Sequence, residues 1–355
     1  MTRKILLAGG GHSHALALLY FAGRIPRGAE ITLLSDSEYA PYSGMLPGFI
    51  AGQFCREECL INLPALCARA GARWKQAAAV KINCDGKRVE LQNGSAEEFD
   101  ILSVNVGGAP RPLFSGIGVK PVMPFMNWLE TLPAAPAFAV IGAGAGGVET
   151  ALALRRRFPD GSVCLIGETF LPEFNESARR RLRAVLEARK IMFIQGEAEN
   201  IDGASACMRG GGAVKLNIPG GAKMHAVFAT PAAAPEWLQN GGLLLDENGF
   251  VRVNQFLQSE THPAVFAAGD CAASGAPKSG VVAVRQAPVL ARNILAAATG
   301  APLRPWRLRR RRLAILNTAD RRAVAVWGGF AAGGAWAWTW KKYLDKKFMN
   351  RFAPV

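Results

Sequence analysis

The chain has 355 residues, of which 50% are hydrophobic and 19% charged, and its formal net charge at pH 7 is +15. This composition excludes a disordered chain, and the length is enough for one large core or for roughly two or three smaller ones. The positive charge indicates an anionic partner, which could be a phosphate-bearing cofactor, an acidic membrane surface or nucleic acid.

The seven cysteines are scattered along the chain and lack the paired spacing of a zinc site. An odd number of scattered cysteines favours a reduced, cytoplasmic protein over a disulfide-bonded one. Residues 1–11 (MTRKILLAGGG) lead directly into the first expected strand, so we expect no signal peptide.

The first part of the chain reads as a strand, a glycine-rich turn, a helix and a second strand. The stretch ILLAGGGHSHALALL (5–19) places Gly9 and Gly11 at the first two positions of the dinucleotide-binding pattern G-x-G-x-x-G and His14 at the third. Because histidine is larger than the usual glycine, either the helix shifts or the imidazole fills space beside the ligand. We predict a dinucleotide turn that includes His12 and His14, with packing favoured over catalysis for both and no metal site.

The strand that follows, EITLLSD (30–36), ends in Ser35 and Asp36. Hydroxyl and carboxylate groups at this point can accept hydrogen bonds from the adenosine ribose of a bound dinucleotide. The alternation of strands and helices predicts an α/β fold, with a parallel sheet between layers of helices.

The same unit starts again in the middle of the chain, at AFAVIGAGAGGVETALALRRR (137–157). Gly142, Gly144 and Gly147 complete the pattern G-x-G-x-x-G between a strand and a helix, which predicts a second dinucleotide site at a helix N-terminus. Glu168 ends the next strand, roughly twenty-five residues further on, where a carboxylate accepts bonds from a ribose and repels a 2′-phosphate. This favours NADH over NADPH, unless Glu168 is only a solvated loop residue.

A third pattern, THPAVFAAGDCA (261–272), is a short apolar strand that ends in Gly269 and Asp270. A carboxylate at the carboxyl edge of a sheet can accept hydrogen bonds from the ribityl chain of a flavin. Two glycine turns followed by this Gly-Asp pair are far more specific than any of the three patterns alone.

The uncharged segment 323–340 is long enough for a transmembrane helix, but its two Gly-Gly pairs and the strand-like residues 323–327 favour a short strand and a turn. The stretch WAWTWKKYLDKKFMNRF (336–352) reads as an amphipathic helix. Its expected apolar stripe consists of Trp336, Trp340, Leu344, Phe348 and Phe352. The chain's own sheet, another protein or an anionic lipid surface could cover this stripe. No nucleic-acid-binding fold accompanies the basic residues, so nucleic acid is not expected.

Four stretches carry a family resemblance, namely GGGHSH (9–14), PYSGMLPGFIAG (41–52), VRQAPVLARNI (284–294) and WKKYLDKKFMNRF (340–352). With the two glycine turns and the Gly-Asp pair, they make the chain similar to flavoproteins with two dinucleotide-binding domains, the pyridine nucleotide-disulfide reductase superfamily. Within it the chain resembles type II NADH dehydrogenases and the FAD/NAD-binding module found fused to selenide, water dikinase. The sequence contains no dikinase domain, so a selenium role rests on analogy alone.

The resemblance implies FAD at the first glycine turn and NADH or NADPH at the second. It implies that Tyr42, Ser43 and Pro47 lie along the flavin ring system. It further implies that Asp270 holds the ribityl or pyrophosphate end of FAD.

The resemblance also implies that a helix begins near Arg285 and Gln286 and points its positive N-terminal end at the flavin. Glu149 falls where relatives keep a carboxylate near the nicotinamide and flavin N5, as a positioning group rather than a proton donor. Glu149 and Gln286 are the implied catalytic candidates.

The chain departs from disulfide reductases at the flavin, because PYSGMLPG (41–48) contains no cysteine where those enzymes carry a C-x4-C pair. Direct dithiol chemistry is therefore not expected. Cys55 and Cys59 are predicted to meet on one helix face, either as a peroxide-sensitive pair or as two reduced thiols. Cys271 is expected close to the flavin, or simply as a small buried residue.

The expected protein is an FAD-dependent NAD(P)H oxidoreductase that passes hydride from nicotinamide to flavin and electrons on to a quinone or another small acceptor. The alternatives are a flavoprotein that handles sulfide or selenium compounds, and a non-catalytic flavin-bound sensor or partner module for a selenophosphate-synthesis enzyme. We expect two Rossmann-like domains and a small C-terminal module. The expected boundaries are 1–110 and 255–305 for the FAD domain, 111–254 for the NAD(P)H domain and 306–355 for the C-terminal module. We expect a cytoplasmic protein, peripheral on the inner face of the membrane if the basic helix binds lipid, and a homodimer is compatible with the sequence.

Overall fold

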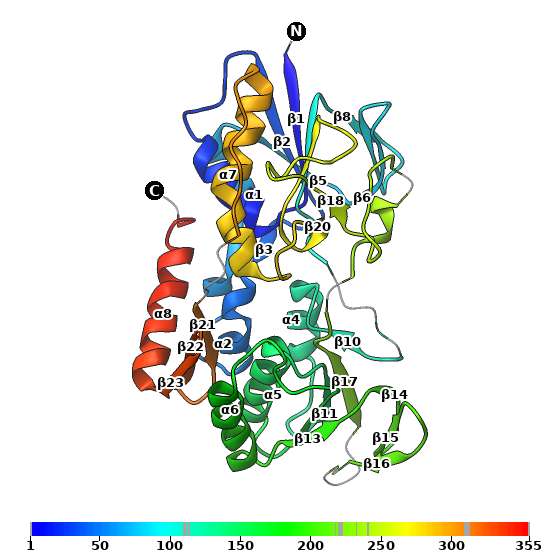
Figure 1. Ribbon diagram of the computed structural model, residues 1–355, viewed down its shortest axis with the longest axis vertical. Coiled ribbons are helices and arrows are strands. Elements are labelled where there is room, and N and C mark those ends of the chain that lie inside the picture. Colours follow the sequence, from blue (N-terminus) through cyan, green and yellow to red (C-terminus); the bar gives the residue numbers. More distant parts are fainter. Residues whose placement is uncertain are drawn as a thin grey trace.

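The computed structural model describes residues 2–108, 112, 114–216, 218, 223–231, 233–239, 241–308 and 313–353. Two sheets of five parallel strands form the centres of two separate units, which confirms the predicted α/β class. In Figure 1 the first unit lies at the top and the second at the bottom, and the C-terminal segment runs along one side. The expected boundary at 110/111 falls outside the described residues, and the other boundaries stay predictions.

The first unit is built on a parallel sheet with the strand order β19-β9-β1-β2-β5. Its strands are β1 (Arg3–Ala8), β2 (Ala29–Ser35), β5 (Arg73–Gln76), β9 (Ile101–Val104) and β19 (Val265–Ala267). Its helices are α1 (His12–Phe21), α3 (Leu63–Ala70) and α7 (Gly280–Thr299), whereas α2 (Leu46–Ile50) packs against the helix Ala145–Arg157 of the second unit. Smaller sheets are formed by β3 (Tyr39–Pro41) with β4 (Leu60–Asn62), by β6 (Ala79–Asn83), β7 (Arg88–Leu91) and β8 (Ala96–Glu98), and by β18 (Val251–Arg252) with β20 (Ala272–Ala273).

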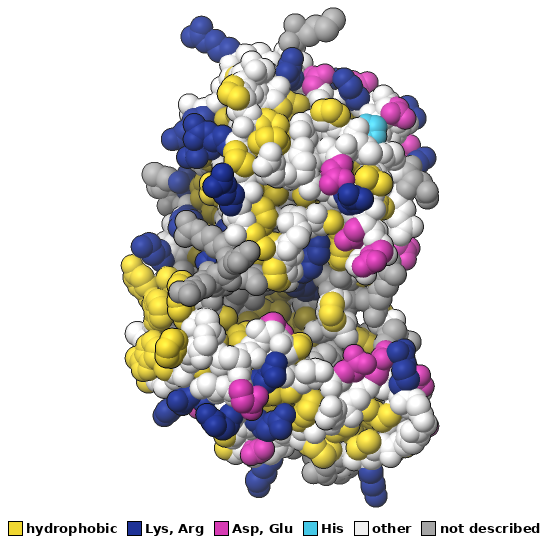
Figure 2. All heavy atoms as spheres, viewed as in Figure 1, with side chains coloured by type: hydrophobic (Ala, Val, Ile, Leu, Met, Phe, Trp, Pro, Cys, Tyr) yellow, Lys and Arg dark blue, Asp and Glu magenta, His cyan; other side chains and the backbone are white. Residues whose placement is uncertain are grey.

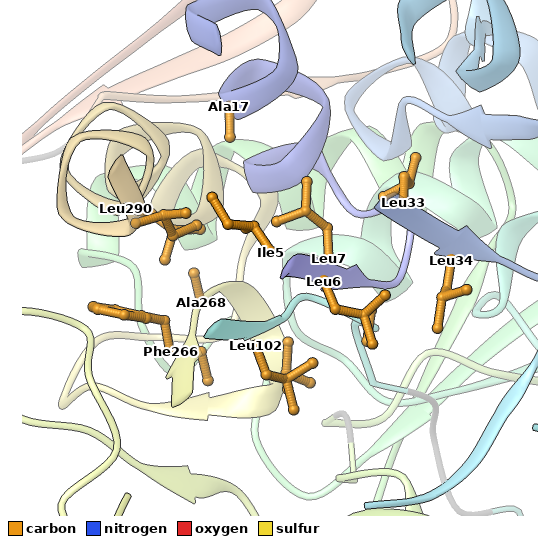
Figure 3. Close-up of a cluster of buried hydrophobic side chains, with 14 of the residues drawn as sticks. Ile5, Leu6, Leu7, Ala17, Leu33, Leu34, Leu102, Phe266, Ala268 and Leu290 are labelled. Carbon is orange, nitrogen blue, oxygen red and sulfur yellow. The ribbon is translucent and has the colours of Figure 1, made fainter. Parts of the chain in front are cut away.

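The core of the first unit follows the period of two along β1. Figure 3 shows Ile5 and Leu7 pointing toward Ala17 of α1 and Leu290 of α7, while Leu6 points to the opposite side of the sheet. Both faces of the sheet are therefore covered, as expected for a buried parallel sheet.

The second unit repeats this plan with the strand order β10-β17-β11-β12-β13. Its strands are β10 (Ile117–Gly118), β11 (Ala137–Ile141), β12 (Ser162–Gly167), β13 (Met192–Gln195) and β17 (Met224–Phe228). Its helices are α4 (Val122–Glu130), α5 (Ala145–Arg157) and α6 (Glu176–Ala188). A three-stranded antiparallel sheet, β14 (Ala198–Asp202), β15 (Ser205–Met208) and β16 (Ala213–Lys215), is attached to it.

The C-terminal module is an antiparallel sheet of β21 (Leu313–Asn317), β22 (Ala323–Trp327) and β23 (Phe330–Gly334), followed by α8 (Ala335–Met349). The prediction of a strand and a turn at 323–327 is thus confirmed. Among the described residues, one helix, α7, has the length and composition of a membrane-spanning segment, and it packs against α1 in the core of the first unit.

The residues of the predicted apolar stripe on α8 differ in burial. Phe348 is buried, whereas Trp336, Trp340 and Leu344 are 52%, 40% and 38% exposed. With 3.6 residues per turn, each step of four residues advances by about 40° around the helix, so five such positions cannot share one face. Phe352 lies beyond the last residue of α8.

The prediction that Cys55 and Cys59 meet on a helix face is also wrong. Cys55 lies outside any helix, and Glu57–Cys59 form a single 3-10 turn. Cys55 is exposed and Cys59 is buried. The Glu58 carboxylate accepts a bond from the Cys55 backbone N–H at 3.0 Å, which holds this segment in a turn that does not continue as a helix.

Candidate functional site

A cavity of about 820 Å³ lies at the carboxyl ends of β1, β2, β9 and β19, where parallel α/β sheets bind their ligands. It is lined by the first glycine turn, by strand ends, by the connector before α4 and by the first turn of α7. Among the predicted residues it brings together Gly9, Gly11, His12, Ser35, Asp36, Ser43, Gly269 and Asp270. The unpredicted residues Asn105, Lys120 and Gly280 also line it.

The first glycine turn leaves no room for side chains. Gly9 has a φ of +97°, and a Cβ there would lie 2.6 Å from the carbonyl oxygen of Asn105. A Cβ at Gly11 would overlap the Asn105 side chain. The backbone of the turn is therefore exposed to a ligand at the N-terminus of α1, which is the geometry that a dinucleotide diphosphate requires.

Asn105 holds this turn in place, and the sequence analysis missed it. Its Oδ1 accepts bonds from the backbone N–H groups of Ser13 (3.0 Å) and His14 (3.3 Å), and its Nδ2 donates to Ala268 O at 2.6 Å. The side chain thus joins the end of β9 to the start of α1 and to the segment after β19. A polar residue directly after the apolar strand ILSV (101–104) was the available signal.

His14 does not line the cavity, which corrects its prediction as a cofactor-binding residue. Its side chain is fully buried, with Nδ1 2.7 Å from Gly9 O and Nε2 2.8 Å from Ser103 Oγ. Burial lowers the pKa of His14 to about 4, so the ring is neutral at pH 7. The imidazole contacts the glycine turn on the side away from the cavity and stabilises it there. This explains how a histidine can replace the third glycine.

His12 faces the cavity, and its Nε2 is buried without a hydrogen-bond partner among the described residues. Its ring meets the rings of Tyr42 and Phe348 edge-on, with centroids 5.4 and 6.2 Å away. Burial, followed by the charge of Lys120, lowers the pKa of His12 to about 4. An unpaired buried nitrogen in a glycine-lined cavity fits a bound polar group such as FAD.

Of the three loop residues that were expected along the flavin, only one lines the cavity. Ser43 lines the cavity, whereas Tyr42 and Pro47 do not. Tyr42 stacks on Phe348 of α8 at 4.3 Å and donates to Asp345 Oδ1 at 3.4 Å, so it points toward the C-terminal module. Pro47 is buried within α2.

The predicted roles of Arg285 and Gln286 are also corrected. Helix α7 begins at Gly280, and it is this residue, with Ala283, that lines the cavity. Gln286 is fully buried, accepts a bond from the Gly269 N–H at 2.7 Å and donates to Ser274 Oγ at 3.0 Å. Both polar atoms of its side chain are thus used to hold the Gly-Asp segment and Ser274, so the structure places Gln286 as a positioning residue. Arg285 is not among the lining residues.

The second glycine turn has the close packing that the pattern predicts. A Cβ at Gly142 would lie 2.7 Å from Ala229 O, and one at Gly147 would overlap the carbonyl oxygen of Gly142. Gly144 is the N-cap of α5 and lies open, so the helix N-terminus is presented to a ligand. Glu168 follows β12 directly and is exposed, so its place beside a ribose stays a prediction.

A carboxylate already lies at the N-terminus of α5. Glu173 Oε1 accepts a bond from the Ala145 N–H at 3.4 Å, and it lies 3.7 Å from the position of a Cβ added to Gly144. A dinucleotide diphosphate would bind the same N–H groups. Glu173 therefore stands where the phosphate is expected, and the sequence analysis missed it.

Glu149 lies on α5, and its carboxylate faces the C-terminal module. Its Oε1 accepts a bond from the backbone N–H of Asn317 at 2.7 Å. Burial raises the pKa of Glu149 to about 7, against the opposing charge of Lys341 and the Asn317 N–H. The group can therefore hold or release a proton near neutral pH.

Lys341 and Asp345 on α8 complete this largely buried polar cluster, although neither belongs to the predicted site. Lys341 Nζ lies 2.9 Å from Asp345 Oδ2 and donates to Gly44 O at 2.8 Å. Burial raises the pKa of Asp345, whose Oδ1 accepts from Tyr42. Three parts of the chain, namely α5, the loop at 42–44 and α8, thus meet at one set of charges.

Comparison with known proteins gives relatives over most of this length. Residues 3–287 match the family model described as Pyridine nucleotide-disulphide oxidoreductase. Ferroptosis suppressor protein 1 of Xenopus laevis is 24% identical over 247 residues, and the match covers 66% of this chain and 66% of that protein, just under two thirds of its length.

Two solved structures share the fold of the whole chain. The sulfide:quinone oxidoreductase of Aquifex aeolicus has a TM-score of 0.78 at 21% identity, over 100% of this chain and 93% of that one. NDH2 from Plasmodium falciparum has a TM-score of 0.77 at 14% identity, over 99% and 98% of the two chains. Because the family model spans both glycine turns and the Gly-Asp segment, the chain belongs to the pyridine nucleotide-disulphide oxidoreductases.

Proposed function

We propose that this protein oxidises NADH at the second glycine turn and delivers the electrons to a quinone or a similar small acceptor. The observation that carries the proposal is the position of Glu149. This residue lies on the helix whose N-terminus faces the nucleotide, and its carboxylate lies in the polar cluster with Lys341 and Asp345. Helix α5 therefore connects the proposed nucleotide site at its N-terminus to the polar cluster, in which Glu149 can carry a proton.

FAD, when bound in the cavity of the first unit, supplies hydride acceptance from the nicotinamide and electron transfer to the acceptor. Asn105 and His14 fix the glycine turn that would hold it, and Gln286 fixes the Gly-Asp segment. Glu149 holds a proton close to neutral pH, and Lys341 places a positive charge beside it. Exposed Glu168 supports NADH as the substrate, because its carboxylate would repel a 2′-phosphate.

The test is anaerobic stopped-flow absorbance of the flavin-loaded protein after mixing with NADH or NADPH. We expect NADH to bleach the flavin band rapidly and NADPH to do so more slowly. Faster bleaching by NADPH would contradict the assignment of Glu168. A bound flavin that neither nucleotide bleaches would reject the oxidoreductase proposal and favour a sensor or partner module.

Sulfur or selenium chemistry through Cys271 is not supported by its surroundings. The thiol is fully buried, and its Sγ lies 3.4 Å from Val104 O and 3.3 Å from Ala268 O. Burial raises the pKa of Cys271 to about 11, so it carries little thiolate at neutral pH. A nucleophilic role would need the opposite shift.

We further propose that the C-terminal module lies on an anionic membrane surface. Phe330, Trp336 and Tyr343 are 82%, 52% and 58% exposed. Lys342 and Lys347 lie over the neighbouring rings of Trp338 and Tyr343. Figure 2 shows hydrophobic side chains gathered at this edge of the molecule, over α8 and β23. Exposed aromatic rings next to lysines are typical of helices that bind the membrane interface.

Sedimentation with lipid vesicles tests this second proposal with a matched pair of variants. Leu344 and Leu244 are 38% and 40% exposed, but only Leu344 lies on α8, the helix that carries the exposed rings of Trp336 and Tyr343. We expect Leu344→Ser to lower the fraction bound to anionic vesicles severalfold and Leu244→Ser to leave it unchanged. Equal binding of both variants, or equal binding to anionic and zwitterionic vesicles, would reject the membrane surface.

A further inference from the structure

Lys120 connects the two nucleotide-binding units across the cavity. It lies on the connector between β10 and α4 of the second unit, while Asp270 follows β19 of the first. Lys120 Nζ is 2.6 Å from Asp270 Oδ2, and the two side chains are 32% and 10% exposed. Both residues line the cavity that also contains the first glycine turn. The ion pair is therefore part of a ligand site and not of the outer surface.

The charges on the wall of this cavity are unbalanced. Among its described lining residues, Asp36, Glu236 and Asp270 are acidic, and Lys120 is the single lysine or arginine. A dinucleotide adds the two negative charges of its diphosphate to this wall. The helix N-terminus of α1 offsets part of that charge with its backbone N–H groups. Asp36 and Glu236 are exposed to solvent, whereas Asp270 is buried, so the negative charges that most need a cation are those of Asp270 and the diphosphate.

The position of Lys120 fits that need. Its ammonium contacts Asp270, and its charge also reaches His12 at the start of α1, where it contributes to lowering the pKa of that ring. Lys120 therefore contacts the Gly-Asp segment directly and shares the cavity with the start of α1, which would receive the diphosphate. We infer that Lys120 is a binding residue for FAD, as the cation that offsets the diphosphate charge, and that Asp270 holds its ammonium in place. This inference rests on the proposed use of the cavity by FAD.

The direct test is equilibrium binding of FAD to the full-length, deflavinated protein, followed by flavin fluorescence. Loss of a charge-assisted contact corresponds to roughly a tenfold to hundredfold increase in Kd, which we expect for Lys120→Met. Lys120→Arg keeps the charge and is expected to stay within a few-fold of the wild type. The wild-type affinity should also fall more steeply with added salt than that of Lys120→Met.

Two further variants separate a binding role from a purely structural one. Lys120→Met leaves Asp270 as a buried carboxylate without its partner, so the double variant Lys120→Met with Asp270→Asn should recover part of the lost FAD affinity. If the single variant Lys120→Met does not fold, FAD binding to the double variant is measured in its place. The control is Lys4→Met, because Lys4 pairs with Glu98 on the surface, where the two side chains are 54% and 73% exposed.

The outcomes are distinct. If Lys120→Met binds FAD as the wild type does and lowers only the melting temperature of the apoprotein, Lys120 is an interdomain latch and the inference is wrong. If the wild type itself binds no FAD, both the inference and the proposed function fail. If the wild type binds FAD but NADH does not reduce it, the proposed function fails while the expected loss of affinity in Lys120→Met still supports the inference.

Discussion

Replacing Gly147 by alanine should lower the free energy of unfolding by about 2 to 3 kcal/mol and weaken NADH binding at least about tenfold. A Cβ at Gly147 would overlap the carbonyl oxygen of Gly142, so α5 would have to move away from the turn that precedes it. At the neighbouring Gly146, no heavy atom of the described residues outside the helix's own backbone and the adjoining residues lies within 4 Å of the same added atom. The two glycines stand next to each other in one helix, and only one of them touches the turn.

Gly146→Ala is the matched control. It is expected to gain up to about 1 kcal/mol of stability, because alanine favours a helix more than glycine does. Denaturant unfolding measures the stability of both variants, and titration with NADH measures their affinity. If Gly147→Ala unfolds and binds NADH as the wild type does, α5 does not pack on the turn as described, and the second nucleotide site is wrongly assigned.

Replacing Glu149 by glutamine should stabilise the protein at about pH 8 by up to about 3 kcal/mol. Burial raises the pKa of Glu149 from its ordinary value of 4.5 to about 7. Between these values the folded state binds the proton more tightly than the unfolded state, so stability falls as the pH rises through this window. Glutamine cannot ionise and keeps an acceptor for the Asn317 N–H, so this loss of stability disappears.

The same change should remove the pH dependence of turnover near neutrality. Glutamine resembles the protonated carboxyl group, so the variant is expected to keep the low-pH behaviour of the wild type from about pH 6 to about pH 8. The wild type should change its rate of acceptor reduction over this range, as Glu149 ionises beside Lys341 and Asp345. Identical pH profiles for the two proteins would show that Glu149 takes no part in the reaction.

Glu58 provides a control, because its pKa is shifted in the opposite direction to that of Glu149. Its carboxylate accepts a bond from the Cys55 N–H at 3.0 Å and lies 3.2 Å from Lys346. The bond from Cys55 is the main cause of the lowered pKa of Glu58. Its stabilising effect is therefore present at neutral pH and lost as the pH falls, so Glu58→Gln should be slightly less stable than the wild type at about pH 8. A Glu149→Gln variant that is also less stable there would contradict the buried-acid interpretation.

The two glycine turns could be predicted because their chemistry is local. Each requires a strand, a close approach of backbone and a helix start within about fifteen residues of sequence. The contacts of Gln286 could not be predicted in the same way. The sequence shows a polar residue near a helix start, but only the folded chain shows that its amide is fully used by Gly269 and Ser274.

The unpredicted site residues depend on contacts between distant parts of the chain. Lys120 meets Asp270 across 150 positions of sequence, and Tyr42 meets Asp345 across 303. No periodicity or spacing encodes such pairs. On α8 the four-residue spacing of large apolar side chains predicted a stripe but not what covers it, and the helix docks largely through Ala337, Asp345 and Phe348.

The Glu173 carboxylate at the start of α5 makes nucleotide binding an exchange of one anion for another. Under the proposed function, the affinity for the dinucleotide would be the difference between two associations with the same N–H groups, one of them intramolecular. Such a site would bind a dinucleotide more weakly than one whose N–H groups have no partner. The side chain would return to the helix terminus as the diphosphate departs, so a single carboxylate would favour release of the nucleotide over its retention.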